Sequence, residues 1–193
     1  MNSRDRILNK VGAYKIEAVE RPQLPKIVPY TENKTEAFKK SLRNAAADWA
    51  ELKPGENIGK LIAELYPQAR RIASSIPGIE GVDLNPEESE DAKSLDGTEV
   101  GIVKGCFGVI ENGAVWISQD VRHKAIYFIS EALVVLLDKN EIVENMHEAY
   151  KRPELQEDFT YGCFIAGPSK TADIEQALVI GAHGARSLTV VFV

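Results

Sequence analysis

Two apolar runs near the C-terminus, residues 161–166 and 188–193, constrain the fold of this chain most. Apolar runs of this length, bounded by Gly and Pro turn signals, predict buried β-strands. The apolar positions between them predict a short helix over residues 172–180. This stretch therefore predicts one strand–loop–helix–strand unit. The last run is too apolar for a sheet edge, so we expect it inside the sheet.

The rest of the chain continues this mixture of strands and helices. Apolar runs predict strands over residues 71–75, 100–103, 109–110, 114–117, 125–129 and 133–137. Helices are expected over residues 7–11, 35–52, 58–65 and 86–91, and after a capping box at residues 138–141. The pattern predicts an α/β fold with a mixed, mostly parallel sheet flanked by helices. We expect one domain over residues 1–193, in which a helical segment, 1–66, packs on a sheet-containing core, 67–193.

Charge and hydropathy argue against two classes of partner, although a local basic patch is still possible. The 193-residue chain has a net charge of -6, whereas a general nucleic-acid-binding protein needs a basic face. No apolar run approaches the ~20 residues that span a bilayer. The first ten residues lack the apolar centre of a signal peptide. We therefore expect a cytoplasmic protein without nucleic-acid or membrane partners.

Cysteine and histidine usage argues against a metal or cluster on this chain. The two cysteines, Cys106 and Cys163, stand far apart in the sequence, and an iron–sulfur cluster normally needs about four thiolates. The three histidines are equally scattered and show no metal-ligand spacing. We expect two reduced thiols, no bound cofactor, and any redox groups on partner proteins.

The loop after residue 166 is the first candidate binding site. Gly167, Ser169, Lys170 and Thr171 precede the expected helix, and free N–H groups at a helix start, beside a lysine, attract anions. In the alternative interpretation a hydroxyl caps the helix, Lys170 is solvated and Asp173 already satisfies the helix dipole. The loop is not a Walker A motif.

Two turns supply the remaining candidates. His183 and Gly184 follow the expected helix, where the imidazole could bind a ligand or act as an acid or base, or only hydrogen-bond its own loop. Glu111, Asn112 and Gly113 separate two apolar runs. Asn-Gly in this position predicts a type I′ hairpin, with the alternative that Glu111 is a nucleophile or general base at a strand end.

A short basic cluster completes the set of candidates. Arg122 is followed by a histidine and a lysine, just before an expected strand. These side chains could meet an anionic substrate, although three such residues at a strand entrance are more often solvated. We keep Arg122 as a candidate ligand-binding residue.

Residues 167–175, together with Gly181, His183 and Gly184, resemble the LUD-domain family, whose pattern is close to G-P-S-x-T-A-D-I followed by G-x-H-G. A weaker similarity covers residues 99–130. There the family's acidic A-E-T-G-T-like turn reads Ile-Glu-Asn-Gly-Ala, so both threonines are missing. Ala185 replaces a proline that follows His-Gly in the family, and residues 1–66 match only loosely.

The resemblance implies a fold similar to the NagB/RpiA/CoA-transferase-like group. It also implies a role in oxidising L-lactate to pyruvate with two partner proteins that carry iron–sulfur clusters. Our first hypothesis is an accessory component that binds a small anion near Ser169, Lys170, Thr171 and His183, with Glu111 facing the same hollow at one edge of the sheet. An oligomer remains open.

Two other functional hypotheses remain. Glu111-Asn112-Gly113 resembles the Glu-Asn-Gly motif of class I CoA-transferases, which implies an enzyme that acts on CoA esters or small carboxylates through Glu111. Alternatively, the chain is a scaffold subunit whose surface carries its function.

Overall fold

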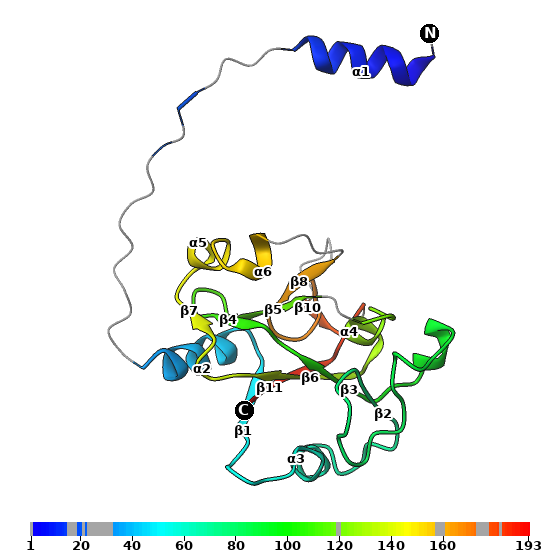
Figure 1. Cartoon of the computed structure of the whole chain (residues 1–193), viewed down its shortest axis with the longest axis vertical. Helices are drawn as coiled ribbons and strands as arrows, with labels where there is room; N and C mark the ends of the chain where they lie inside the picture. Colours follow the sequence, from blue (N-terminus) through cyan, green and yellow to red (C-terminus); the bar gives the residue numbers. More distant parts are fainter. Residues whose placement is uncertain are drawn as a thin grey trace.

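The computed structural model describes residues 2–14, 19–20, 22, 33–118, 121–156, 161–172, 178–181 and 183–193. Its helices, drawn in Figure 1, are α1 (Ser3–Ala13), α2 (Lys34–Asn44), α3 (Ile58–Leu65), α4 (Ile126–Ile129), α5 (Met146–Ala149) and α6 (Pro153–Gln156), with a 3-10 turn at Ala92–Leu95. The strands are β1 (Asp48–Glu51), β2 (Ile72–Ser74), β3 (Val100–Lys104), β4 (Phe107–Val109), β5 (Ala114–Ser118), β6 (Ala132–Leu137), β7 (Ile142–Val143), β8 (Gly162–Ile165), β9 (Lys170–Ala172), β10 (Leu178–Ile180) and β11 (Ser187–Phe192).

The main sheet has five parallel strands in the order β1-β11-β6-β3-β2. β11 pairs with β1 on one side and with β6 on the other, from Ser187 opposite Ala132 to Phe192 opposite Leu137. The prediction that the C-terminal apolar run lies inside the sheet is therefore confirmed. Its side chains from Leu188 to Phe192 are all buried, as expected for a strand covered on both faces.

Strand alternation sends apolar side chains to two separate layers. Ile102, Val134 and Val191 belong to the cluster that packs under α3. Val135 and Val190 belong to a larger cluster that also contains residues of α2, α4 and β5. Figure 1 shows α3 on one side of the main sheet and the remaining layers on the other.

A second sheet, β7-β4-β5-β8, covers this larger cluster. β4–β5 and β5–β8 are antiparallel, whereas β7 pairs with β4 in parallel. On its outer face, Phe107, Trp116 and Phe164 pack with Ala149 of α5 and Leu155 of α6. The predicted α/β class, with mostly parallel strands flanked by helices, is confirmed, although the sequence did not separate the strands into two sheets.

The helix expected over residues 35–52 is wrong in its second half. α2 ends at Asn44, and Ala46 adopts a φ of 61°, which a continuing right-handed helix cannot contain. Trp49 instead lies in β1, opposite Val190. Residues 1–66 are therefore not wholly helical, because β1 is an edge strand of the main sheet. α1 contains no buried residue.

Three further expectations fail for local reasons. Asp138 accepts the N–H of Asn140 at 2.8 Å in a turn, and β7 follows instead of a helix; Asn145 is the cap of the later α5. Residues 86–88 form a turn after Asn85, whose side chain accepts the N–H of Glu87, and residues 89–91 are not helical. The apolar run over residues 125–129 forms α4, because so short a run carries no clear period.

A buried lysine joins α2 to β1. The Nζ of Lys39 lies 2.7 Å from Oε1 of Glu36, 2.5 Å from Oε1 of Glu51 and 4.1 Å from the ring centroid of Trp49. Burial opposes its charge, but the hydrogen bonds and charges of both glutamates outweigh burial and raise the pKa of Lys39. The hydrogen bond from Lys39 in turn lowers the pKa of Glu51.

This pair predicts a pH-dependent contribution to stability. A carboxylate whose pKa falls on folding stabilises the folded state above its unfolded pKa, and this contribution is lost as the pH falls through the folded pKa. Because Glu51 is largely exposed, we expect Glu51→Gln to cost at most about 1 kcal/mol at pH 7 and nearly nothing at pH 3. Urea unfolding at both pH values measures this, with the exposed Glu64→Gln as control. An equal cost at both pH values would contradict it.

Candidate functional site

A cavity of about 320 Å³ lies where the end of β8 and two loops meet α4 and the first residues of β6 and β11. Its innermost lining is apolar and comes from Tyr127, Leu133 and Leu188, all at most 3% exposed. Phe164 and Ile165 of β8 form a wall. The polar side chains of the lining are those of Tyr127, Ser169 and His183. The cavity thus has an apolar interior, with the candidate loops at its rim.

The two candidate loops hold each other in place. The N–H of Ser169 donates to the carbonyl of Ala185 at 2.8 Å, and the N–H of Gly181 donates to the carbonyl of Ser169 at 2.9 Å. A Cβ placed on Gly184 would lie 3.1 Å from Cβ of Ser169, so glycine permits this close approach. The structure therefore brings Gly167, Ser169, His183 and Gly184 to one cavity.

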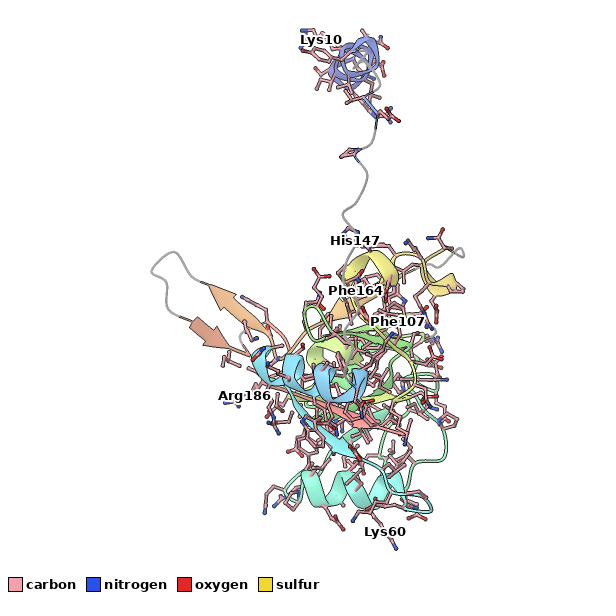
Figure 2. The ribbon with its side chains drawn as sticks, turned by 90° about the vertical axis from the view of Figure 1, so that its left-hand side faces the viewer. Lys10, Lys60, Phe107, His147, Phe164 and Arg186 are labelled. Carbon is pink, nitrogen blue, oxygen red and sulfur yellow. The ribbon has the colours of Figure 1, made fainter. Side chains whose placement is uncertain are left out.

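The helix expected over residues 172–180 is wrong where the structure describes it. β9 and β10 pair as an antiparallel hairpin, with Ala172 opposite Leu178 and Lys170 opposite Ile180; Figure 2 shows this hairpin extending from the body of the molecule. β-branched residues such as Thr171, Val179 and Ile180 favour strands, and the pattern was too short to establish a helical period. No helix begins at Ser169 or Thr171, so the anion argument loses its basis. Asp173 lies outside the described residues.

Lys170 is turned away from the cavity. Its Nζ donates to the carbonyl of Ala45, the C-cap of α2. A cation at this position satisfies a free carbonyl of the helix end and interacts favourably with the negative end of the helix dipole. Gly167, which has a φ of 72°, packs against the same carbonyl oxygen. The alternative interpretation of Lys170 as a solvated side chain is therefore correct in one respect, because Lys170 is exposed. It missed that the same side chain caps a helix.

Glu111 has a structural partner. Oε2 of its carboxylate accepts the N–H of Met146, the first residue of α5, at 2.8 Å, and its own N–H donates to the carbonyl of Glu144 at 3.0 Å. Asn112 accepts the N–H of Ala114 at 3.0 Å. Gly113 has a φ of 67°, but Asn112 does not have a positive φ. The turn is therefore not type I′, which requires positive φ at both central residues.

The two candidate turns are neighbours but do not share the cavity. A Cβ on Gly113 would lie 2.7 Å from the carbonyl oxygen of Ser41, and one on Gly167 would lie 1.9 Å from that of Ala45. Both turns therefore pack against the C-terminal end of α2. Neither Glu111, Asn112 nor Gly113 is among the residues that line the cavity. The expected shared hollow therefore contains one motif and not the other.

Arg122 also lies outside the cavity lining. Its N–H donates to Oε1 of Glu87 at 2.8 Å, and Nε2 of the neighbouring His123 lies 2.8 Å from the carbonyl oxygen of Ser89. Nζ of Lys124 lies 4.7 Å from the ring centroid of Tyr161. The cluster therefore anchors the segment before α4 to the loop that follows β2.

Sequence reasoning missed the aromatic residues that line the cavity. Tyr127 and Phe128 were part of an expected strand, and only the fold brings them to the cavity. Phe164 also lines it, but its ring packs with Trp116 on the outer face of the second sheet. On the same strand as Phe164, burial raises the pKa of the Cys163 thiol. Burial and the thiol together raise the pKa of Tyr161. Within the described ranges, no three His, Cys, Asp or Glu side chains could hold a metal ion.

The partner of Glu111 leads to a prediction. We expect Glu111→Gln to change the free energy of unfolding by less than about 0.5 kcal/mol, because the amide oxygen can still accept the N–H of Met146. Glu111→Ala should cost about 1 kcal/mol, as the loss of a helix cap does. Urea denaturation of both variants measures the difference. Equal stability of the two variants would contradict the assigned capping role.

Comparison with known proteins assigns these loops to a family. The family model described as the LUD domain matches residues 84–193, a segment that contains both loops, the Glu111 turn and the inner strands of the main sheet. The chain belongs to the LUD-domain family. The resemblance of residues 167–175 to this family is thereby confirmed.

Curated relatives support this family assignment. A lactate utilization protein C of a Geobacillus species is 31% identical over 138 residues, 66% of this chain and 57% of that protein. The protein of the same name in Oceanobacillus iheyensis is 29% identical over 103 residues, 49% of this chain and 43% of that protein. The chain thus spans about half the length of the curated relatives it matches.

The structural neighbour extends the agreement to the fold. A crystal structure of a DUF162 family protein from Deinococcus radiodurans matches with a TM-score of 0.64, 17% identity, and coverage of 82% of this chain and 95% of that chain. The fold therefore extends over most of the chain. None of the described helices is long and apolar enough to cross a membrane.

Proposed function

We propose that this LUD-domain protein is an accessory component of lactate utilization, acting where L-lactate is oxidised to pyruvate. The proposal is supported by relatives named lactate utilization protein C. The observation that carries it is the convergence of the two family-motif loops on one cavity. In this proposal Gly167, Ser169, His183 and Gly184 form the ligand-facing rim.

The proposal assigns electron transfer to partner proteins. The chain has two cysteines, fewer than the roughly four thiolates that an iron–sulfur cluster normally needs. Iron–sulfur proteins of the same pathway would supply the clusters, and this chain would bind them or their small ligand in the cytoplasm. The elevated pKa of Cys163, which follows from burial, suits a thiol that stays protonated rather than a metal ligand.

Covalent catalysis through Glu111 has no supporting observation in the structure. Its carboxylate is hydrogen-bonded to the backbone of α5, and it does not line the cavity. A nucleophile in a CoA-transferase-like reaction must reach the acyl carbon. For this reason we do not extend the proposal to an enzyme that acts on CoA esters.

Growth on lactate tests the proposal. Deleting the gene should abolish growth with L-lactate as sole carbon source and spare growth on glucose. The wild-type gene and Glu111→Gln should both restore growth. A tagged copy should also co-purify with iron–sulfur proteins from lactate-grown cells. Undiminished growth of the deletion strain on lactate would refute the proposal, and failure of Glu111→Gln alone would reinstate a catalytic glutamate.

A further inference from the structure

α1 presents an apolar face that is largely exposed. Ile7, Leu8 and Val11 are 59%, 52% and 67% exposed, and their spacing along the chain places them on one side of the helix. Figure 1 and Figure 2 both show α1 apart from the two sheets. A helix of 11 residues is marginal in water without packing. A stable α1 therefore requires a surface that covers this face.

The same helix is basic. Arg4, Arg6 and Lys10 outnumber its one carboxylate, that of Asp5, although the whole chain has a net charge of -6. Charge complementarity favours a contact between surfaces of opposite sign, so the surface that covers α1 should combine apolar with acidic side chains. An anionic membrane fits α1 less well, because the helices that lie in a membrane interface have a broader, more strongly apolar face.

Two adjoining cavities at the carboxyl ends of β2, β3 and β6 form such a surface, which we call the carboxyl-edge groove. They measure about 620 Å³ and 280 Å³, and Ile76 lines both. Leu136, Val193 and Ile58, the first residue of α3, add to the apolar floor of the larger cavity. Lys104 lies opposite Leu136 in the register of β3 and β6, and Leu136 belongs to the cluster under α3. The groove therefore opens on the α3 side of the main sheet.

The charges of the groove are mostly negative. Its lining carries five carboxylates and one amino group, that of Lys104. Arg152 pairs with Glu141 at 2.7 Å and with Glu154 at 2.5 Å. The other three carboxylates form no ion pair with any described residue, and they belong to Asp83, Glu88 and Asp138. The three basic side chains of α1 would therefore meet three carboxylates that lack a counter-ion.

The N-terminal segment joins the sheets beside this groove. The hydroxyl of Thr35, in the first turn of α2, donates to the carbonyl of Lys139 at 3.5 Å. Lys139 directly follows Asp138, which lines the groove. Residues 15–32, between the caps of α1 and α2, can span at most roughly 65 Å. A tether attached at this point gives α1 a high effective concentration at the groove of its own chain.

We infer that α1 docks in the carboxyl-edge groove of its own chain. Ile7, Leu8 and Val11 then lie on the apolar floor, and the basic side chains face the unpaired carboxylates. Open α/β sheets bind ligands outside the carboxyl ends of their strands, so the docked helix covers the edge from which such a sheet is usually reached. The inference goes beyond the proposed function, whose cavity lies at the first residues of β6 and β11.

Thiol labelling of the full chain locates the docked helix. Cys106 lines the groove and is partly exposed, whereas Cys163 lies in β8 of the second sheet and is the internal reference. Leu8→Asp places a charge on the apolar face of α1, and Asn9→Asp places the same charge on the opposite face. We expect Leu8→Asp to accelerate the reaction of Cys106 with N-ethylmaleimide by about threefold or more, because the docked helix shields the thiol. The rate at Cys163, and both rates in Asn9→Asp, should stay at the wild-type value.

Hydrogen exchange measures the docking itself. The amides of α1 in the full chain should exchange about tenfold more slowly than those of a peptide of residues 1–14, and Leu8→Asp should remove this protection. Because the contact forms within one chain, the protection should not depend on protein concentration. Exchange as fast as in the peptide, a Cys106 rate that Leu8→Asp does not change, protection that rises with protein concentration, or protection only with anionic vesicles would overturn the inference.

Discussion

Replacing Phe38 with alanine is expected to lower the free energy of unfolding by about 3–5 kcal/mol, the usual range for a fully buried phenylalanine. Phe38 is 0% exposed. Its ring lies 6.2 Å from that of Phe192 in the main sheet, in a T-shaped contact. The tip of the same ring is 2.7 Å from where a Cβ on Gly108 of the second sheet would lie. The side chain thus fills the space between the two sheets, and its loss leaves a cavity.

Phe128→Ala is the matched control, because Phe128 is 45% exposed. It should cost no more than about 1.5 kcal/mol, since half of its surface already meets water. Urea unfolding followed by circular dichroism measures both variants. Comparable losses in the two would show that Phe38 does not join the sheets as described.

The second large effect is expected at Gly167. A Cβ there would lie 1.9 Å from the carbonyl oxygen of Ala45, which is backbone and cannot rotate away, and the residue has a φ of 72°. Left-handed backbone costs a non-glycine residue about 1–2 kcal/mol, and the clash adds to this by forcing the turn away from α2. We expect Gly167→Ala to lose about 3 kcal/mol of stability and to displace the cavity rim.

Gly55 separates the two contributions. It has a φ of 81°, yet nothing lies within 4 Å of the Cβ position. Gly55→Ala should therefore show the backbone cost alone, about 1 kcal/mol. Thermal or urea unfolding of both variants gives the difference that belongs to the contact with Ala45. Equal losses would mean that the turn moves freely and that α2 does not hold it.

The inner strands could be predicted because their apolar runs are continuous. β3, β6 and β11 are buried on both faces, so residues 100–103, 133–137 and 188–193 reveal them without any partner. β1 could not be recognised in this way. Trp49 and Leu52 continue the helical spacing of Phe38 and Leu42, and only pairing with β11 decides against the helix.

The candidate site, like the fold, could be predicted from the sequence only in part. The two glycine-containing loops were visible in the sequence because their spacing matches a family pattern, and they do meet at one cavity. The orientation of side chains was not visible. Lys170 and Glu111 were interpreted as ligand-facing groups, whereas each completes the backbone of a helix end, of α2 and of α5. Such roles depend on elements 35 or more residues away along the chain.

The most direct test of this account is growth on L-lactate of a deletion strain that carries Ala166→Trp. Ala166 is exposed and lines the cavity, so the indole should block the cavity without loss of folding. Ala63→Trp, at an exposed position on α3, controls for the added ring. We expect Ala63→Trp to restore growth and Ala166→Trp to fail although its melting temperature matches the control. Full growth with Ala166→Trp would contradict a role for the cavity.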